Sequence, residues 1–274
     1  MWTLTGFADE ISPELDKQLN TLAEESISFM ELRSVWNTNV LDLTDEELQR
    51  VRTATAEIGI SSIGSPIGKV PVTDQFGPHL ERFRRALHVA DVMEAPYVRV
   101  FSFFIPEGQE PALYRDEVID RMGILAGEAE DAGVTLLHEN EKEIYGDVPS
   151  RCVDILASVG SQALRAAWDA ANFVQCGASR PYEDGYESLR PYIEYVHVKD
   201  ALSGSGKVVE AGEGDGQLPE TLSALRASGF DGFFSLEPHL ASSGRYSGFS
   251  GPELFRKAAG AFKELLRRQE IQWA

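Results

Sequence analysis

Four apolar segments in the second half of the chain carry an acidic side chain or a histidine at or near their ends. The clearest is VTLLHEN, residues 134–140, in which Glu139 follows a hydrophobic run typical of a buried strand. Burying an ionised carboxylate without a partner costs free energy or shifts its pKa until the group is neutral. Glu139 must therefore reach solvent, pair with a cation or bind a metal ion.

The other three segments carry the same kind of chemistry. LRAAWDAAN contains Asp169, YVHVKD contains His197 and Lys199, and GFFSLEPHL contains Glu237. Side chains alternate between the two faces of a strand, so His197 and Lys199 share one face. If these faces point into one interior, three carboxylates and one imidazole meet there.

Crowded carboxylates need a cation, because each negative charge makes ionisation of the next less favourable. A divalent metal ion would supply it. Oxygen-rich ligation with one histidine and no thiolate suits Mn²⁺, our first expectation, or Mg²⁺, with Co²⁺ or Zn²⁺ as alternatives. The competing interpretation is a set of unrelated rim residues in salt bridges, since structural ion-pair networks are common.

Strand-like runs alternate with helical stretches along the whole chain. The runs WTLTGFA, SISFMELRSV, ISSIGSP and YVRVFSFF precede the four segments named above, and a helical stretch follows each run. Ser12 with Pro13 predicts the start of the first helix, and Thr44 with Glu47 forms a capping-box pattern before the second. Eight such units of about 34 residues predict a closed (β/α)8 barrel, an α/β fold of one domain over residues 1–274.

An open sheet that binds a dinucleotide is the alternative to a barrel. It would carry a G-x-G-x-x-G turn after the first strand, but the turn here reads GFADEIS. The segment GYESLRPYIE before the seventh strand is expected to be helical. The Gly/Ser-rich stretches LSGSGK, AGEGDG and ASSGRYSGFSG are long connections, and in a barrel they would lie on the active face.

Composition restricts the class of partner. The chain has 25 basic and 44 acidic side chains, a net charge of -19, which disfavours binding to nucleic acid or to an anionic membrane surface. The isolated Cys152 and Cys176, with no signal peptide or membrane-spanning apolar run, favour a cytoplasmic protein. We expect a small-molecule partner, and a homo-oligomer stays open.

The motifs HENE, WDAAN, YVHVKDA, GEGDG and LEPHL resemble those of the xylose isomerase-like barrels, and the likeness covers nearly the whole chain. This sugar phosphate isomerase/epimerase group includes ketose 3-epimerases, hydroxypyruvate isomerases, inosose dehydratase and 3-dehydroshikimate dehydratase. The resemblance implies a TIM barrel whose metal ion is held by Glu139, Asp169, His197 and Glu237. It also implies that Glu139 and Glu237 exchange protons with the substrate from opposite faces, as in the epimerase members.

The activity implied is that of a metal-dependent isomerase or epimerase of a sugar, a sugar phosphate or a related hydroxy-ketone. A metal ion that chelates a carbonyl and its neighbouring hydroxyl would stabilise the enediolate formed when a carboxylate removes the α-proton. Loss of a β-hydroxyl from the same intermediate is dehydration, so a lyase of a cyclic polyol ketone is the alternative. A second alternative is a barrel that binds a sugar or polyol without turnover.

A DNA-repair endonuclease of the same superfamily is disfavoured. It has a trinuclear zinc centre, which needs more histidines at the strand ends than this chain offers. Such an enzyme also needs a basic groove, and the net charge of this chain has the wrong sign for one.

Further side chains near these segments are candidates for substrate contact. Lys199 could protonate a departing hydroxyl or hold an oxyanion, unless it pairs with Asp200 or another rim acid. Asn172 stands where several ketose epimerases have a substrate-binding histidine, and Ser203 where they have an arginine. His239, two residues after Glu237, contacts the substrate or makes a rim hydrogen bond.

Two arginines in earlier strands complete the candidates. Arg33 and Arg99 could meet a substrate carboxylate or phosphate through two parallel hydrogen bonds. The alternative is a buried pair between Glu31 and one of these arginines.

Overall fold

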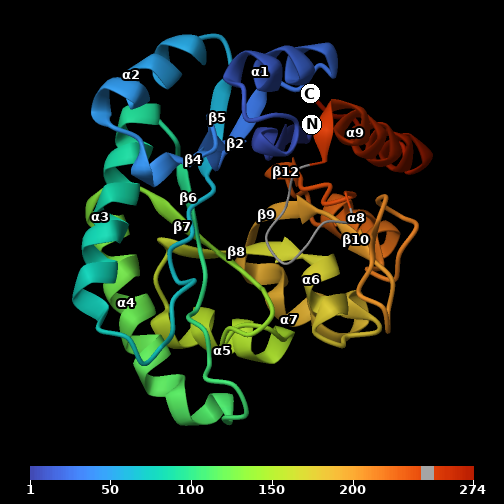
Figure 1. The fold of residues 1–274 in the computed structure, drawn as a ribbon. Coiled ribbons are helices and arrows are strands. Elements are labelled where there is room, and N and C mark those ends of the chain that lie inside the picture. The colour runs from blue at the N-terminus through green and yellow to red at the C-terminus, as the bar shows by residue number, and fades with distance from the viewer. Residues whose placement is uncertain (242–249) are drawn as a thin grey trace.

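A parallel sheet of eight strands, curved into a nearly closed barrel, forms the centre of the computed structural model, which describes residues 1–241 and 250–274 (Figure 1). The strand order is β1-β12-β9-β8-β7-β6-β5-β2, and a parallel bridge between Phe7 and Glu31 joins the two ends. The expected (β/α)8 fold is confirmed. The strands are β1 (Thr3–Gly6), β2 (Phe29–Leu32), β5 (Gly59–Ile63), β6 (Tyr97–Val100), β7 (Thr135–Glu139), β8 (Leu164–Asp169), β9 (Ile193–Val198) and β12 (Phe233–Leu236).

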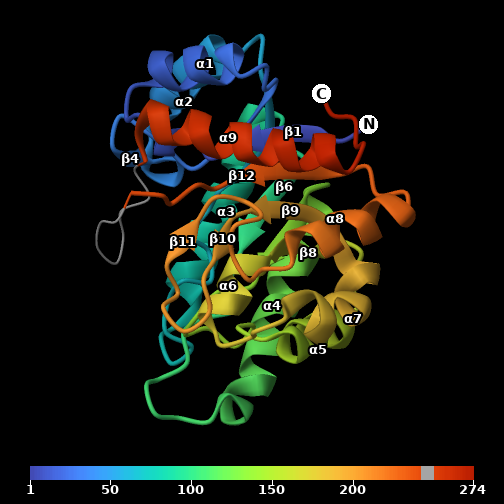
Figure 2. The ribbon, with the colours of Figure 1, turned by 90° about the vertical axis from the view of Figure 1, so that its right-hand side faces the viewer.

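Helices cover the outside of the barrel, and α9 lies across β1 and β12 (Figure 2). Its Phe262 packs on Phe234 of β12 with ring centroids 5.8 Å apart. A Cβ atom at Gly6 would lie 3.0 Å from the ring of Phe255, so glycine permits this close packing.

The helices are α1 (Leu15–Glu24), α2 (Asp45–Ala54), α3 (Phe76–Met93), α4 (Arg115–Asp131), α5 (Pro149–Val159), α6 (Ala170–Gln175), α7 (Glu187–Leu189), α8 (Leu218–Ala227) and α9 (Gly251–Arg268). None of them, in the described part of the chain, is long and apolar enough to cross a bilayer.

The barrel interior decides which side chains reach its mouth. Leu137, Ala167 and Tyr195, from three neighbouring strands, contact each other inside the barrel. Because strand side chains alternate, the residues two positions further along β7, β8 and β9 also point inward, toward the carboxyl ends of the strands. The parallel register pairs Asp169 with His197. The predicted inward faces are therefore the observed ones.

Of the two predicted helix starts, one is confirmed and one is wrong. The capping box is present, with the Thr44 hydroxyl accepting from the Glu47 N–H and the Glu47 carboxylate accepting from the Thr44 N–H. The predicted start of the first helix is wrong. Helix α1 begins at Leu15 with Glu14 as N-cap, and the Ser12 hydroxyl accepts from the Glu14 N–H before the helix begins.

The segment GYESLRPYIE does not form the expected continuous helix. A π-helical turn at Tyr182–Tyr186 leads into the three residues of α7 and a 3-10 turn at Arg190–Tyr192, after which β9 begins. Pro191 removes a backbone donor. Gly185 packs so closely on Pro149 that an added Cβ would lie 2.4 Å from the proline ring. Tertiary packing has overridden the helical pattern.

Two short hairpins extend the loops that follow β2 and β9. The first pairs β3 (Ser34–Val35) with β4 (Thr38–Asn39), and the second pairs β10 (Asp200–Ala201) with β11 (Val208–Val209). The Gly/Ser-rich stretches LSGSGK and AGEGDG belong to the second of these loops. Most of the third stretch, ASSGRYSGFSG, lies outside the described residues.

Candidate metal centre

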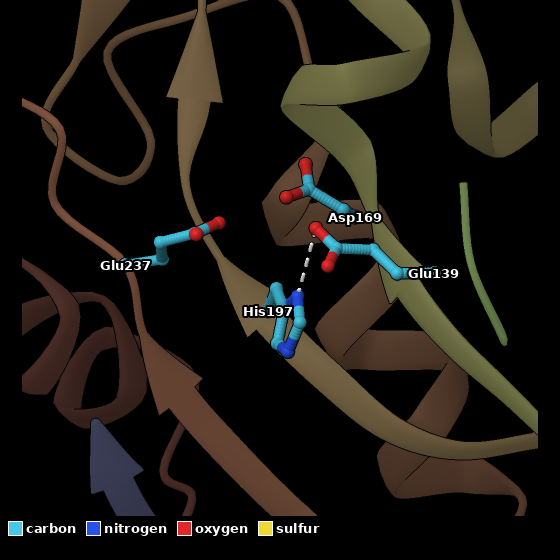
Figure 3. A group of neighbouring side chains, drawn as sticks. All are labelled: Glu139, Asp169, His197 and Glu237. Atoms are coloured by element: carbon cyan, nitrogen blue, oxygen red, sulfur yellow. Dashed lines mark ion pairs between the residues drawn. The ribbon is translucent and has the colours of Figure 1, made fainter. Parts of the chain in front are cut away.

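Four buried side chains meet at the carboxyl ends of neighbouring strands. Glu139 ends β7, Asp169 ends β8, His197 lies in β9 and Glu237 directly follows β12. One potential ligand atom from each lies within 4.8 Å of those of the other three, and none of the four residues is more than 3% exposed. Figure 3 shows Glu237 reaching toward the group from the side opposite Glu139. The structure thus brings together the four residues that the sequence motifs single out.

The donor set fits a divalent cation. Three carboxylates and one imidazole supply hard oxygen and borderline nitrogen ligands, which suit Mn²⁺ and Mg²⁺ and also admit Zn²⁺ or Co²⁺. His197 Nδ1 lies 3.1 Å from Glu139 Oε1 (Figure 3), yet neither ring nitrogen makes a hydrogen bond of good geometry. Neither ring nitrogen is therefore held by a well-formed hydrogen bond, and one of them can bind a metal ion once its proton is lost.

Lys199 supplies a positive charge beside this group. Its ammonium lies 3.0 Å from Asp169 Oδ2 and 2.7 Å from Glu237 Oε2, and the residue is only 5% exposed. The alternative expectation, a pair with Asp200 or another rim acid, is wrong for Asp200 and confirmed for Asp169 and Glu237. The Asp200 carboxylate turns away and accepts backbone N–H groups of the following loop, including that of Gly212.

Electrostatics differ among the carboxylates. Burial acts to raise the pKa of Glu139, but the charges of His197 and Arg99 outweigh it and lower that pKa to about 2. Burial raises the pKa of Asp169 to about 6, because Lys199 offsets it only in part and the charges of Glu139 and Glu237 add to it. Asp169 is thus less readily ionised than Glu139, and a metal ion bound beside it would lower its pKa and favour the carboxylate form.

Metal binding is expected to release a proton from His197. Burial acts to lower the pKa of this imidazole, but Glu139 and Glu31 outweigh it and raise the pKa well above its usual value. The metal-free ring is therefore protonated at neutral pH, and it must lose a proton to become a ligand. Apparent affinity should accordingly rise with pH. Calorimetric titration with Mn²⁺ in two buffers of different ionisation enthalpy measures the proton, and equal heats in both would contradict the assignment.

Arg33 and His239 form a second layer around Glu237. Arg33 Nη1 lies 3.2 Å from Glu237 Oε1, and its Nε donates to Asp9 Oδ2 at 2.7 Å. His239 Nε2 lies 3.4 Å from Glu237 Oε1 and 3.0 Å from Glu10 Oε1. The His239 N–H also donates to Glu10, which stabilises the left-handed backbone of His239 at φ 42°.

Glu10, Glu237 and His239 also lie close enough together to hold an ion. A cation is already present there, because the guanidinium of Arg33 lies 3.8 Å from Glu10 Oε1 as well as near Glu237. A second divalent ion would have to bind beside this fixed positive charge. Among the described residues, the geometry therefore favours the four-residue group over this second group as the place for a metal ion.

Asn172 and Arg99 hold Glu139 from its other sides. The Asn172 amide donates to Glu139 Oε1 at 3.1 Å, and the Arg99 guanidinium donates to Oε2 at 3.1 Å. Arg99 Nη1 also lies 3.9 Å from Glu237 Oε1. The arginine thus spans the two glutamates expected to exchange protons.

Glu31 has a role that the sequence did not indicate. The residue is fully buried, and its Oε2 lies 3.3 Å from His197 Nε2 and accepts from the Tyr195 hydroxyl at 3.0 Å. The expected pairing with Arg33 or Arg99 is wrong. When the ring loses one proton, the Glu31 carboxylate beside Nε2 favours keeping the remaining proton there, which leaves Nδ1, on the side of Glu139, to bind the metal ion.

We expect Glu31→Gln to weaken metal binding by about 10- to 100-fold while the barrel stays folded, the usual cost of losing an outer-shell partner. Equilibrium dialysis with Mn²⁺ measures the affinity, and circular dichroism checks the fold. Glu141→Gln is the matched control, because Glu141 lies at the mouth of the barrel and pairs with Lys69. Equal metal affinities in wild type, Glu31→Gln and Glu141→Gln would contradict the orienting role of Glu31.

Asp9 and Glu10 are the other residues that sequence reasoning missed. They directly follow the first apolar strand, in GFADE, and so carry the same strand-end signal that singled out Glu139. Asp9, Glu10 and Glu31 show that the first two strands also supply acids to the site.

A cavity of about 640 Å³ opens above the four-residue group. This volume falls within the range of small-molecule sites. Asp169 and His197 lie beneath its lining, and the other predicted site residues line it, namely Arg33, Arg99, Glu139, Asn172, Lys199, Glu237 and His239.

A family model described as "Xylose isomerase-like TIM barrel" matches residues 19–265. An uncharacterized protein of Methanocaldococcus jannaschii is 25% identical over 165 residues, 58% of this chain and 56% of that protein. The match therefore spans little more than half of this curated relative.

Solved structures share the fold. A D-tagatose 3-epimerase-like protein has a TM-score of 0.78 at 19% identity, with 98% of each chain covered. The probable 3-DHS dehydratase AsbF of Bacillus anthracis has a TM-score of 0.71 at 18% identity, covering 96% of this chain and 98% of its own. A xylose isomerase-like TIM barrel protein of Mycobacterium smegmatis in complex with magnesium has a TM-score of 0.68 at 20% identity, with 97% of each chain covered.

Proposed function

The chain belongs to the xylose isomerase-like TIM barrel family, and from this we propose that it is a divalent-metal-dependent isomerase or epimerase of a sugar or related hydroxy-ketone. The observation that carries the proposal is the approach of Glu139 and Glu237 to one cavity from opposite sides, where they meet Asp169 and His197 in a group that could hold a metal ion (Figure 3). Glu139, Asp169, His197 and Glu237 would hold the ion. Bound there, it would supply a Lewis acid for a carbonyl oxygen and its neighbouring hydroxyl.

Glu139 and Glu237 are the proposed proton carriers. Burial alone would raise the pKa of Glu237, but Lys199, His239 and other cations outweigh it and lower that pKa well below its usual value. With the pKa of Glu139 lowered to about 2, both glutamates are ionised at neutral pH. Either can therefore accept a proton from a substrate carbon, and the other can return one to the opposite face.

Neighbouring residues would orient the reacting groups. Asn172 and Arg99 fix the two oxygens of Glu139, so its free lone pairs point in defined directions. Lys199 lies 2.7 Å from Glu237 and lines the cavity, where its ammonium can hold an oxygen that becomes negative. His239 and Arg33 line the side of the cavity nearest Glu237 and are proposed substrate contacts.

Solvent exchange tests the proposal. Purified protein loaded with Mn²⁺, Mg²⁺, Co²⁺ or Zn²⁺ is incubated in D₂O with a panel of ketoses and cyclic ketones, and deuterium on carbon is followed by NMR. We expect exchange to require metal, with Mn²⁺ the most effective. Ligand uptake without any exchange would reject the enzyme and favour a barrel that binds a sugar or polyol without turnover.

A dehydratase is the second candidate, and Lys199 is the observation that favours it. A buried ammonium next to a proton-accepting glutamate can protonate a departing hydroxyl after the glutamate has taken the α-proton. AsbF, a probable 3-DHS dehydratase, has the same fold. Dehydration produces an enone that absorbs in the ultraviolet and isomerisation does not, so an absorbance scan of the same panel separates the two.

Location and assembly stay predictions. We infer a cytoplasmic protein from the isolated Cys152 and Cys176, both free thiols in the structure. Neither nucleic acid nor a membrane surface is an expected partner of a chain with a net charge of -19. Sedimentation analysis would establish whether the protein forms a homo-oligomer.

A further inference from the structure

Arg99 is the buried cation that joins the two glutamates proposed to carry protons. Its Nη1 donates to Glu139 Oε2 at 3.1 Å and lies 3.9 Å from Glu237 Oε1. The guanidinium carbon lies 4.9 Å from the ring centroids of both Phe7 and Phe101. Proton transfer depends strongly on how the reacting groups are oriented. The placement of this guanidinium therefore bears on how well Glu139 can act as a base.

Backbone carbonyls of the loop after β5 hold the rest of the guanidinium. Arg99 Nη2 donates to Gly64 O at 3.3 Å and to Ser65 O at 3.4 Å, and Arg99 Nε donates to Ser65 O at 3.4 Å. The Ser65 hydroxyl donates in turn to the Arg99 carbonyl oxygen. The three guanidinium bonds are longer than the common N–H···O range of about 2.7 to 3.2 Å. A small shift of the loop away from Arg99 would therefore break them.

The backbone N–H groups of this loop show what keeps it in place. From residue 64 to residue 69 they bond within the loop or to the neighbouring strand ends, with one exception. The buried Gly68 N–H donates at 2.9 Å to Nε2 of His79, which lies near the start of α3. A buried N–H group needs such a partner. His79 thus ties the backbone of the loop to a helix outside the barrel.

Gly68 is held from its other sides as well. Its φ is +89°, and a Cβ atom there would lie 1.9 Å from the Phe101 carbonyl oxygen, so the position requires glycine. Its own carbonyl accepts from the Phe103 N–H at 3.0 Å. Phe103 has left-handed backbone at φ 65°, and its ring packs edge-on to that of His79 with centroids 5.8 Å apart. Such strained backbone persists where the surrounding contacts over-determine it.

His79 can accept this hydrogen bond because its ring is uncharged at neutral pH. Burial lowers the pKa of His79 to about 4, and the charges of Arg121 and Arg82 act in the same direction. Nε2 therefore keeps its lone pair for the Gly68 N–H, and the single ring proton lies on Nδ1.

Building on the proposed function, we infer that His79 is a positioning residue for proton transfer. It holds the loop after β5 in place, so that the loop carbonyls direct Arg99 toward Glu139. His79 lies outside the described lining of the cavity, so it acts through the loop and not on the substrate. Loss of its hydrogen bond should lower kcat and leave KM and metal affinity nearly unchanged.

Two substitutions separate the hydrogen bond of His79 from its packing. His79→Gln keeps an acceptor near the place of Nε2 and loses the ring, whereas His79→Phe keeps the ring and loses the acceptor. Deuterium exchange is measured on the Mn²⁺-loaded full chain with D-tagatose and D-fructose. We expect kcat to fall by about 10-fold in His79→Phe, the lower end of the range for outer-shell partners, and to stay close to wild type in His79→Gln. A wild-type kcat in His79→Phe, or a lower kcat in His79→Gln than in His79→Phe, would overturn the inference.

A double-mutant cycle tests whether His79 acts through Arg99. Arg99→Met removes the guanidinium and keeps an unbranched side chain. In that background His79→Phe should cause little further loss of kcat, because two residues on one path are not additive. An undiminished second loss would overturn the path. His88→Phe is the control on the same helix, because His88 is exposed and lies near Asp45, and it should keep the wild-type kcat.

NMR separates failure of this inference from failure of the proposed function. The Arg99 Nε–H signal, identified by its loss in Arg99→Met, is followed in the Mg²⁺-loaded protein. We expect its proton to exchange with solvent about 10-fold faster in His79→Phe than in wild type or His79→Gln, because the loop opens more often. If no ketose exchanges, the proposed function fails, and this difference alone supports the placement of Arg99 by His79. Equal rates in wild type and a folded His79→Phe, checked by circular dichroism, would overturn the inference and leave the proposed function standing.

Discussion

Glu237→Gln is expected to lower deuterium exchange at the substrate carbon by about 1,000-fold, within the range that positioned acids and bases contribute. The amide has nearly the size of the carboxylate and keeps one oxygen for the metal, but it cannot accept a proton. Lys199 loses one of its two carboxylate partners and keeps the other, Asp169, at 3.0 Å. The fold and most of the metal content should therefore survive.

The experiment compares single-turnover exchange rates at saturating Mn²⁺, with metal content measured on the same samples. Glu194→Gln is the matched control, because Glu194 accepts from the Tyr97 hydroxyl at the amino end of β9, away from the metal centre. Wild-type exchange in Glu237→Gln would remove Glu237 from the chemistry. If Glu237→Gln lost both exchange and all bound metal, the result would show Glu237 only as a metal ligand and not as a proton carrier.

Asp169→Asn is expected to lower metal affinity by more than about 100-fold, which exceeds the usual cost of losing an outer-shell partner. Asp169 is fully buried, and its Oδ1 accepts from the Asn172 N–H at the start of α6, so Oδ2, which lies 3.0 Å from the Lys199 ammonium, is the oxygen left for a metal ion. An amide at this position keeps the helix cap and loses the charge. Exchange should fall in proportion to the metal lost and recover in part at high Mn²⁺.

Equilibrium dialysis measures this affinity, with Asp184→Asn on the exposed π-helical turn as the control. Asp169→Asn and Glu237→Gln should fail in different ways, the first by losing metal and the second by losing proton transfer. Equal and small effects of both substitutions would reject the assignment of roles. Unchanged metal affinity in Asp169→Asn would show that Lys199 is its only cationic partner.

The barrel and the centre of the site could be predicted because both depend on periodic patterns. Alternation of apolar strands with helices predicts a parallel barrel, and such a barrel places its strand ends at one mouth. Glu139, Asp169, His197 and Glu237 follow from that rule with no knowledge of loops. Lys199 follows from its shared face with His197, although its carboxylate partners do not.

Partners within the interior could not be predicted in the same way. Glu31 lies on β2 and His197 on β9, and their contact depends on how far each side chain reaches across the barrel. Sequence alternation gives the face of a residue and not its neighbour on the far side. The same limit applies to Glu10 and His239, which are 229 positions apart.

Loop conformation was the other limit. The glycines of AGEGDG gave no indication of whether their N–H groups bind a ligand or the chain itself, because both require the same residue type. In the structure these N–H groups bind the Asp200 carboxylate. The hydrogen bonds join Asp200 to Gly212, 12 residues later, and to Gly216, 16 residues later. The broken helix before β9 has a similar origin, since Gly185 packs on Pro149 of α5.

Anomalous diffraction from a crystal soaked in Mn²⁺ tests most directly whether the four side chains hold one ion. The account predicts a strong peak between Glu139, Asp169, His197 and Glu237, within bonding distance of a ligand atom of each, with the Lys199 ammonium moved away from Asp169. Absence of a peak there at saturating Mn²⁺, with Lys199 still between Asp169 and Glu237, would contradict it.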